Sequence, residues 1–242
     1  MRARGLEICA GSVQSAVAAQ AGGAHRIELC QNLEQGGTTP SYGTIRHVLT
    51  RLAIPVFVLI RPRTGHFCYD AEELAIMEAD IRQCRALGCA GVVLGALNQA
   101  GRVDLAACRR LLAAAGPLPV TFHRAFDACP DQHQALEEII SLGCQRILTS
   151  GGQPTAPAGR TQLAALVQQA TGRISIMPGA GVTPATIRDL ARHTGAHEFH
   201  ASAKRQLAAP PAPKATEFDT PRWETDATIV RELAACLNSP LD

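Results

Sequence analysis

The sequence predicts an α/β protein, a single-domain TIM (β/α)8 barrel with parallel strands that spans residues 1–242. Short apolar runs alternate with longer periodic runs rich in Ala and Leu, which indicates strands joined by helical crossovers. The chain holds eight such units of roughly 30 residues, the number that closes a barrel. After the first apolar run, Cys9–Ser12 lacks the glycine pattern of dinucleotide-binding open sheets, so the closed barrel is favoured over the doubly wound alternative.

Each unit has its own signals. Strands are expected at Leu6–Cys9, Arg26–Cys30, Val56–Arg61, Gly91–Gly95, Val120–His123, Arg146–Thr149, Ile174–Met177 and Glu198–Ala201. Helices are expected near Ser12–Ala21, Ser41–Leu52, Ala71–Leu87, Leu105–Ala115, Gln132–Leu142, Arg160–Ala170, Pro184–His193 and Ala227–Leu237. Helix starts carry capping residues such as Asp70 and Asp104, and helix ends carry glycines such as Gly88 and Gly195.

One segment interrupts the alternation. Leu207–Asp219 contains Pro210, Pro211 and Pro213, has no periodicity and connects the last strand to the last helix. Structureless stretches of this length in a compact domain are functional lids or mobile connectors, and the sequence leaves both open.

Composition excludes several classes of protein. The net charge of +2 argues against a dedicated nucleic-acid binder, and no apolar run approaches the roughly 18 residues that a membrane span needs. The N-terminus lacks the apolar region of a signal peptide, which favours a cytoplasmic location. The nine cysteines form no CxxC pair, and a disulfide framework is not expected.

Strand parity predicts which side chains point into the barrel. Helices cover the outside, so the apolar face of each strand should face them and the polar face should point inward, toward the mouth at the carboxyl ends. The side chains gathered there are Glu7, Cys9, Glu28, Cys30, Arg61, Arg63, His123 and His200, with Arg124 and Asp127 in the loop that follows. Such charges either pair with each other inside a polar core or await a ligand.

Glycine-rich turns give a second signal at the same end. Ser150-Gly151 follows the sixth strand, Gly179 and Gly181 follow the seventh, and Ser202 follows the eighth. Barrels of this type often bind phosphate with loops after the seventh and eighth strands, because free N–H groups there attract anions. The alternative is a set of tight turns that need positive φ.

Two thiols differ from the other seven. Cys9 and Cys30 end neighbouring strands on the same inward parity, where the strands lie about 4.8 Å apart. Two thiolates suit Cu(I), whereas zinc would need two more ligands from Glu7, Glu28 or His200. The alternative is a pair of ordinary buried thiols.

Several runs resemble the copper homeostasis protein CutC family: Leu6-Glu7-Ile8-Cys9, Gly22–Cys30, Gly36–Ser41, Val58–Arg63, Val120–Asp127, Leu148–Gly151 and Glu198–Ala203. The resemblance implies a cytoplasmic TIM barrel that assembles as a homodimer or higher homo-oligomer. It also implies an association with copper, with Cu(I) bound at Cys9 and Cys30. The family usually has Arg-Pro-Arg-Gly-Gly-Asp-Phe where this chain has Arg61–Phe67, so His66 replaces an acidic residue.

Two functions follow as hypotheses. The first is copper homeostasis, with Cu(I) handled by the two thiols and no organic cofactor. The second is a lyase-like or isomerase-like enzyme for a small anionic, possibly phosphorylated, metabolite. In the second hypothesis Arg61, Arg63 and Arg124 bind the anion, with Ser150, Gly151, Gly179, Gly181, His200 and Ser202 as further anion contacts. Glu7, Glu28 and His123 would supply acid or base, and Asp127 would orient His123 or pair with Arg124.

Overall fold

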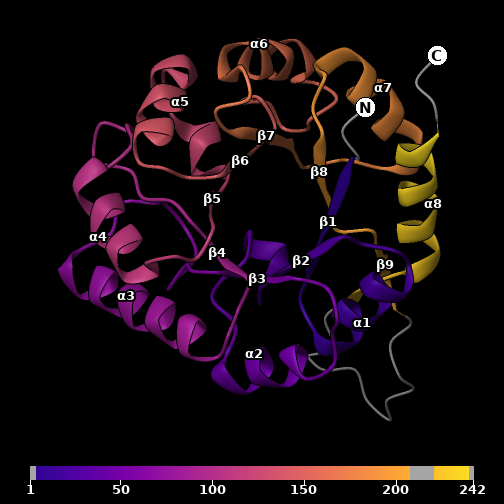
Figure 1. The fold of residues 1–242 in the computed structure, drawn as a ribbon, viewed down its shortest axis with the longest axis horizontal. Helices are drawn as coiled ribbons and strands as arrows, with labels where there is room; N and C mark the ends of the chain where they lie inside the picture. Colours follow the sequence, from indigo (N-terminus) through magenta and orange to yellow (C-terminus); the bar gives the residue numbers. More distant parts are fainter. Residues whose placement is uncertain (1–3, 208–220, 240–242) are drawn as a thin grey trace.

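The computed structural model describes residues 4–207 and 221–239, and these form a ring of strands surrounded by helices (Figure 1). The strands of the ring are β1 (Gly5–Ala10), β2 (Arg26–Leu29), β3 (Val56–Leu59), β4 (Gly91–Leu94), β5 (Val120–Phe122), β6 (Arg146–Thr149), β7 (Ser175–Pro178) and β8 (Glu198–Ala201). The helices are α1 (Val13–Ala21), α2 (Tyr42–Leu49), α3 (Ala71–Ala86), α4 (Leu105–Ala115), α5 (Gln132–Ser141), α6 (Arg160–Ala170), α7 (Pro184–Thr194) and α8 (Ala227–Asn238).

All pairings in this sheet are parallel, in the order β7-β6-β5-β4-β3-β2-β1-β8. The first strand therefore lies between the second and the last, and β7 and β8 lie next to each other at the seam of the ring (Figure 1). The predicted TIM (β/α)8 barrel is confirmed. A parallel sheet of this kind needs a helix to return the chain between strands, which is why strand and helix alternate throughout.

The ends of most predicted elements lie within one or two residues of the observed ends, because the predicted capping residues do cap the helices. Asp70 caps α3 in a reciprocal capping box with Glu73, and Asp104 caps α4. The third strand was predicted to reach Arg61 but ends at Leu59. Its expected continuation leaves the sheet because the Arg61 N–H donates to the hydroxyl of Thr39 at 2.9 Å instead of to a strand.

Two short strands were not predicted. β9 (Lys204–Gln206) and β10 (Trp223–Thr225) form an antiparallel ribbon between β8 and α8, and the ammonium group of Lys204 lies 5.0 Å from the Trp223 ring. The segment predicted as a lid or connector, residues 207–219, lies outside the described residues except for Leu207.

The apolar residues form two layers, of which only the outer one follows from the predicted strand parity. Leu6, Ile8 and Ile27 belong to the large layer between strands and helices. Cys9, Cys30, Phe57, Leu59 and Val93 form a smaller layer inside the barrel. No helix within the described ranges is both long and apolar enough to cross a membrane.

Candidate functional site

A cavity of about 990 Å³ opens among the loops that follow the barrel strands. Its walls include Cys9 and Cys30 and parts of the loops after β3 and β5. Residues 180–184 after β7 and residues 200–204, at the end of β8 and beyond it, complete the lining. The predicted site residues that line it are Cys9, Glu28, Cys30, Arg61, His123, Arg124, Gly181, His200 and Ser202. Those that do not line it are Glu7, Arg63, Asp127, Ser150, Gly151 and Gly179.

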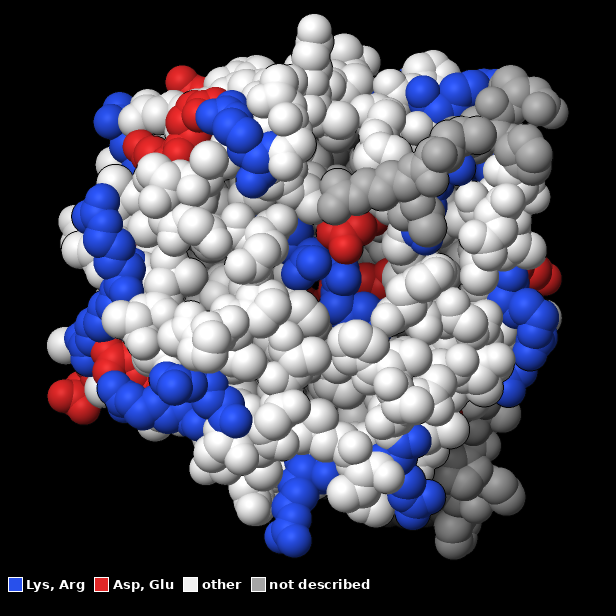
Figure 2. All heavy atoms as spheres, viewed as in Figure 1, with Lys and Arg blue, Asp and Glu red and all other residues white. Residues whose placement is uncertain are grey.

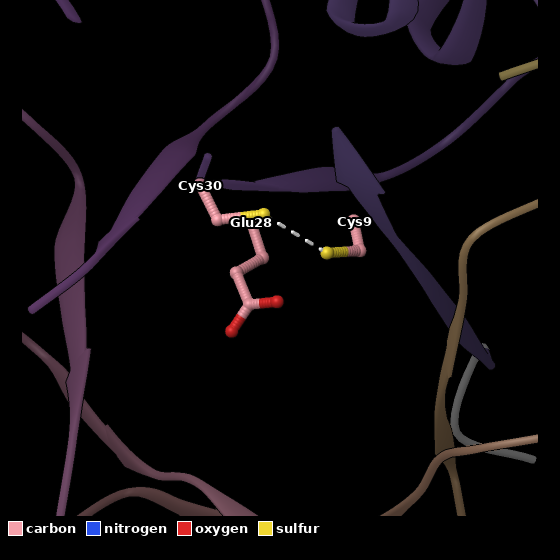
Figure 3. Close-up of side chains that lie close together, drawn as sticks. All are labelled: Cys9, Glu28 and Cys30. Atoms are coloured by element: carbon pink, nitrogen blue, oxygen red, sulfur yellow. Dashed lines mark hydrogen bonds between the residues drawn. The ribbon is translucent and has the colours of Figure 1, made fainter. Parts of the chain in front are cut away.

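The two predicted thiols face each other on one wall. Parallel pairing sets Cys9 opposite Glu28, which places Cys30 one position beyond the end of β2 and on the same inward face. The two Sγ atoms lie 3.3 Å apart, and the carboxylate of Glu28 points to the same side (Figure 3). Ligand atoms from Cys9, Glu28 and Cys30 all lie within 4.8 Å of one another, and all three residues are buried. The hydrogen bond to Cys30 and burial raise the pKa of Cys9 well above its ordinary value, so without a ligand this thiol is protonated.

His200 lies between two carboxylates beside this pair. Its Nδ1 is 2.8 Å from Glu7 Oε1, and its Nε2 is 3.6 Å from Glu28 Oε2. Burial alone would lower the pKa of His200, but the charge of Glu28 and the contacts with Cys9 and Glu7 outweigh it and raise the pKa well above the ordinary value. Without a metal, His200 is therefore a cation that lies next to both carboxylates.

Glu7 points to the interior of the barrel rather than to the cavity. Burial alone would raise its pKa, but the hydrogen bond from His200 and the charge of Arg26 lower it to about 2. Burial raises the pKa of Glu28, and the charge of His200 only partly opposes this. Of these two predicted acid–base groups, only Glu28 reaches the cavity.

Beneath the cavity, charges inside the barrel are matched. Arg26 pairs with Glu7 and with Glu198, the latter at 3.1 Å, and Arg146 pairs with Glu198 at 3.1 Å. Both guanidinium groups lie 5.1 Å from the centre of the Phe57 ring. Figure 2 shows basic and acidic atoms gathered in a hollow at the centre of one face of the molecule. The ion pairs of Arg26 and Arg146 with Glu7 and Glu198, which we call the barrel floor, neutralise one another.

On another wall of the cavity, His123 follows β5 and is 5% exposed. Its Nδ1 accepts a hydrogen bond from the Ala125 N–H at 3.2 Å, which places the ring proton on Nε2. That Nε2 atom is buried and has no hydrogen-bond partner among the described residues. Burial, with the charge of Arg61, lowers the pKa of His123 to about 3, so the ring is neutral. Gly95 makes room for it, because a Cβ there would lie 2.7 Å from Nδ1.

Arg61 is also 5% exposed and lines the cavity. Its Nη1 donates to the carbonyl groups of Gln35 and Gly37, and its Nη2 donates to that of Gly65. Within residues 4–207 and 221–239, no carboxylate pairs with it, and its Nε has no partner. The guanidinium group lies 5.0 Å from the centre of the Phe67 ring.

The other predicted anion contacts are occupied within the protein. Arg63 pairs with Glu73 and donates to backbone carbonyl groups of its own loop, including that of Cys68 at 2.8 Å. Arg124 pairs with Asp127 at 2.8 Å and donates to Ser150 Oγ at 3.0 Å.

Asp127 accepts hydrogen bonds from several groups of the loop after β6. Its donors are the Thr149 hydroxyl and the N–H groups of Ser150 and Gly152. Of the two roles suggested for Asp127, the structure has the pairing with Arg124. Asp127 therefore holds the loop after β6 and does not face the cavity.

The glycine turns are shaped by local packing. At Gly179 a Cβ would lie 2.4 Å from Leu148 Cδ1, so a larger residue there would require the leucine side chain to move. Gly151 and Gly181 have φ of +71° and +69°, the left-handed region that glycine tolerates. The start of α7 is closed by a capping box between Thr183 and Thr186, which occupies donors that an anion would need.

Sequence reasoning did not single out two functional neighbours. Arg146 has the inward parity of its strand and could have been found by that signal. Phe67 contacts both Arg61 and His123, with centroid distances of 5.0 Å in each case. It lies in an irregular loop, so no periodicity in the sequence predicts its position.

Comparison with known proteins finds relatives that match most of the chain. The CutC family model matches residues 5–205. A CutC family protein of Xanthomonas axonopodis pv. citri is 53% identical over 236 residues, which cover 96% of this chain and 98% of the relative. A CutC family protein of Xylella fastidiosa is 57% identical over 205 residues, which cover 85% of this chain and 77% of the relative.

A solved structure of CutC from Streptococcus agalactiae, whose name associates that protein with copper homeostasis, is 37% identical with a TM-score of 0.79. The match covers 82% of this chain and 98% of that one. Phosphoribosylanthranilate isomerase of Pyrococcus furiosus shares the fold alone, with 11% identity, a TM-score of 0.59 and coverage of 97% and 98%. The family model and the bacterial relatives agree over most of the length, and the chain belongs to the CutC family.

Proposed function

We propose that this protein binds Cu(I) as its cargo through the thiolates of Cys9 and Cys30 and serves copper homeostasis. The observation that carries the proposal is the Sγ–Sγ distance of 3.3 Å at the wall of an open cavity. Soft sulfur ligands select Cu(I), and Cu(I) accepts a low coordination number. The name of the relative from Streptococcus agalactiae supports the same metal.

The charges around the pair favour this cargo over zinc. Loss of both thiol protons to solvent and capture of one Cu(I) gives a complex with one net negative charge. The His200 cation next to Cys9 offsets that charge. Zinc would need two further ligands: Glu28 is close enough to supply one, but His200 could supply the other only by losing its proton and its contact with a carboxylate.

A reducing compartment suits this chemistry. All nine cysteines are free thiols. Thiols persist, and copper stays monovalent, where glutathione keeps the environment reducing. We therefore assign the protein to the cytoplasm, and the expected homo-oligomer belongs to the same proposal.

A competition titration tests the metal site. Cu(I) is titrated anaerobically into the protein with a competing probe and excess glutathione, and Cys9→Ser/Cys30→Ser is compared with wild type. We expect wild type to retain one equivalent per chain and the double variant to bind at least about 100-fold more weakly, since each lost thiolate removes a principal ligand.

The chain offers a matched control. Cys84 and Cys89 are a second pair of buried neighbouring thiols, outside the residues that line the cavity. Cys84→Ser/Cys89→Ser should retain the copper. If wild type and both double variants release copper alike, the cavity thiols are ordinary barrel residues and the proposal fails.

One observation favours a ligand other than copper in the same cavity. His123 and Arg61 each present a buried N–H without a partner among the described residues, and a pair of thiolates needs neither.

A further inference from the structure

The wall of the cavity that carries His123, Arg61 and Phe67 has an unsatisfied donor. The His123 Nε2–H is buried and has no partner within the part of the chain that the structure describes. A buried donor left without an acceptor destabilises the protein, because it has lost its hydrogen bond to water. The ring is fixed in this orientation by the hydrogen bond at Nδ1 and by the space left at Gly95. The protein therefore holds a donor ready for an acceptor that enters the cavity.

The same wall has an uncompensated positive charge. Three backbone carbonyl groups contact the Arg61 guanidinium group, but carbonyl dipoles do not neutralise a charge. The adjacent Tyr69 does not neutralise it either, because burial raises the pKa of that phenol to about 12. A water molecule could accept from His123 but would leave the Arg61 charge unbalanced. An anion satisfies both needs at once.

Phe67 joins the two groups and sets the character of the ligand. Its ring centre lies 5.0 Å from the Arg61 guanidinium group and 5.0 Å from the His123 ring centre. Leu33, Leu59 and Leu148 also line the cavity, so much of the surface that a ligand would meet is apolar. On this wall itself, one cation and one neutral donor match a single negative charge, so a monoanion suits these two groups better than a phosphate dianion.

From this juxtaposition we propose that the wall formed by Arg61, Phe67 and His123 binds the carboxylate of a small organic monoacid with an apolar body. The His123 Nε2–H donates to one carboxylate oxygen, the Arg61 charge neutralises the group, and the apolar body lies against Phe67 and the leucines. This site is separate from the thiol pair and does not depend on copper.

The test uses phenylacetate as the probe, with 2-phenylethanol as its neutral analogue and inorganic phosphate as the competing anion. Binding to the full chain is measured by isothermal titration and by the melting temperature, because a ligand that binds only the folded state raises it. We expect phenylacetate alone to bind and to raise the melting temperature.

Variants then locate the binding. His123→Phe keeps an aromatic ring and removes the donor, and should raise the Kd for phenylacetate at least tenfold. His123→Gln keeps an N–H donor and should retain more of the affinity. The control His47→Phe changes an exposed histidine of α2 and should leave the Kd unchanged.

A second readout does not depend on how the variants fold. In wild type labelled at histidine nitrogen, phenylacetate should move the resonance of one neutral imidazole N–H. Three results would overturn the proposal: an equal Kd in His123→Phe and wild type, a rise in melting temperature with phosphate and not with phenylacetate, or no binding of phenylacetate at 10 mM.

Discussion

The barrel floor and the cavity wall use the same residue types in opposite ways. On the floor, Arg26 and Arg146 are each matched by a carboxylate, and both lie close to the Phe57 ring. On the wall, Arg61 and His123 lie against Phe67 and have no carboxylate partner within the described residues. A buried charge matched by a carboxylate needs no ligand and is costly only if its partner is removed, whereas an unmatched charge beside a cavity is a candidate ligand contact.

The largest effect is expected from breaking the floor. Glu198→Ala leaves Arg26 and Arg146 with one carboxylate fewer, and both side chains are only 13% exposed. We expect the free energy of unfolding to fall by about 3–5 kcal/mol, measured by urea denaturation. Glu137→Ala, which breaks the exposed pair with Arg173, is the control and should cause a much smaller loss, because solvent screens this pair. Equal losses of unfolding free energy in both variants would show that the buried ion pairs of the floor matter no more than an exposed pair.

Low pH should destabilise the folded protein through His123. The pKa of His123 is lowered to about 3 by burial and by Arg61, so below pH 6.5 the unfolded chain binds a proton that the folded chain does not. Stability therefore falls as pH falls through this window, by about 2 kcal/mol between pH 6.5 and pH 5 from this group. Urea unfolding of wild type should be steeper in pH by that amount than unfolding of His123→Phe. If stability depended on pH equally in the two proteins, the pKa of His123 would be the same in the folded and the unfolded chain, and the prediction would be wrong.

The smallest effect is expected at the third member of the thiol cluster. Carboxylate oxygen is a hard ligand that Cu(I) does not prefer, so Glu28→Gln should change the Cu(I) affinity by less than about threefold. The measurement is the same anaerobic competition titration. A loss as large as that of the double cysteine variant would make Glu28 a ligand and would favour a harder metal such as zinc.

Strand parity predicted much of this arrangement, because alternation is a strict property of extended chain. It brought Cys9, Cys30 and His123 to one opening. Parity fails where a strand ends. Arg63 shares the parity of Arg61, but β3 ends at Leu59, and beyond it the loop turns Arg63 toward Glu73. The acceptors of Arg61 are carbonyl groups of two loops, which no side-chain pattern encodes.

Burial and pairing of the remaining charges also required the structure. Glu7 was expected as an acid or base, yet its oxygens are occupied by Arg26 and His200. Sequence reasoning allowed either internal pairing or a waiting site for such groups. Only the register that sets Glu7 opposite Arg26 on one side and His200 on the other decides between them.

The positions of the two sites along the chain have a consequence for folding. The thiols are separated by 21 residues and come from the first two strands, which pair directly. Arg61 follows β3 and His123 follows β5, with β4 between these strands. The two residues are 62 positions apart in the chain (123 minus 61). Closing the longer loop costs about 1 kcal/mol more in chain entropy. Contacts between residues close in the chain form sooner than contacts between distant ones. Cys9 and Cys30 should therefore come together during folding before Arg61 and His123 do.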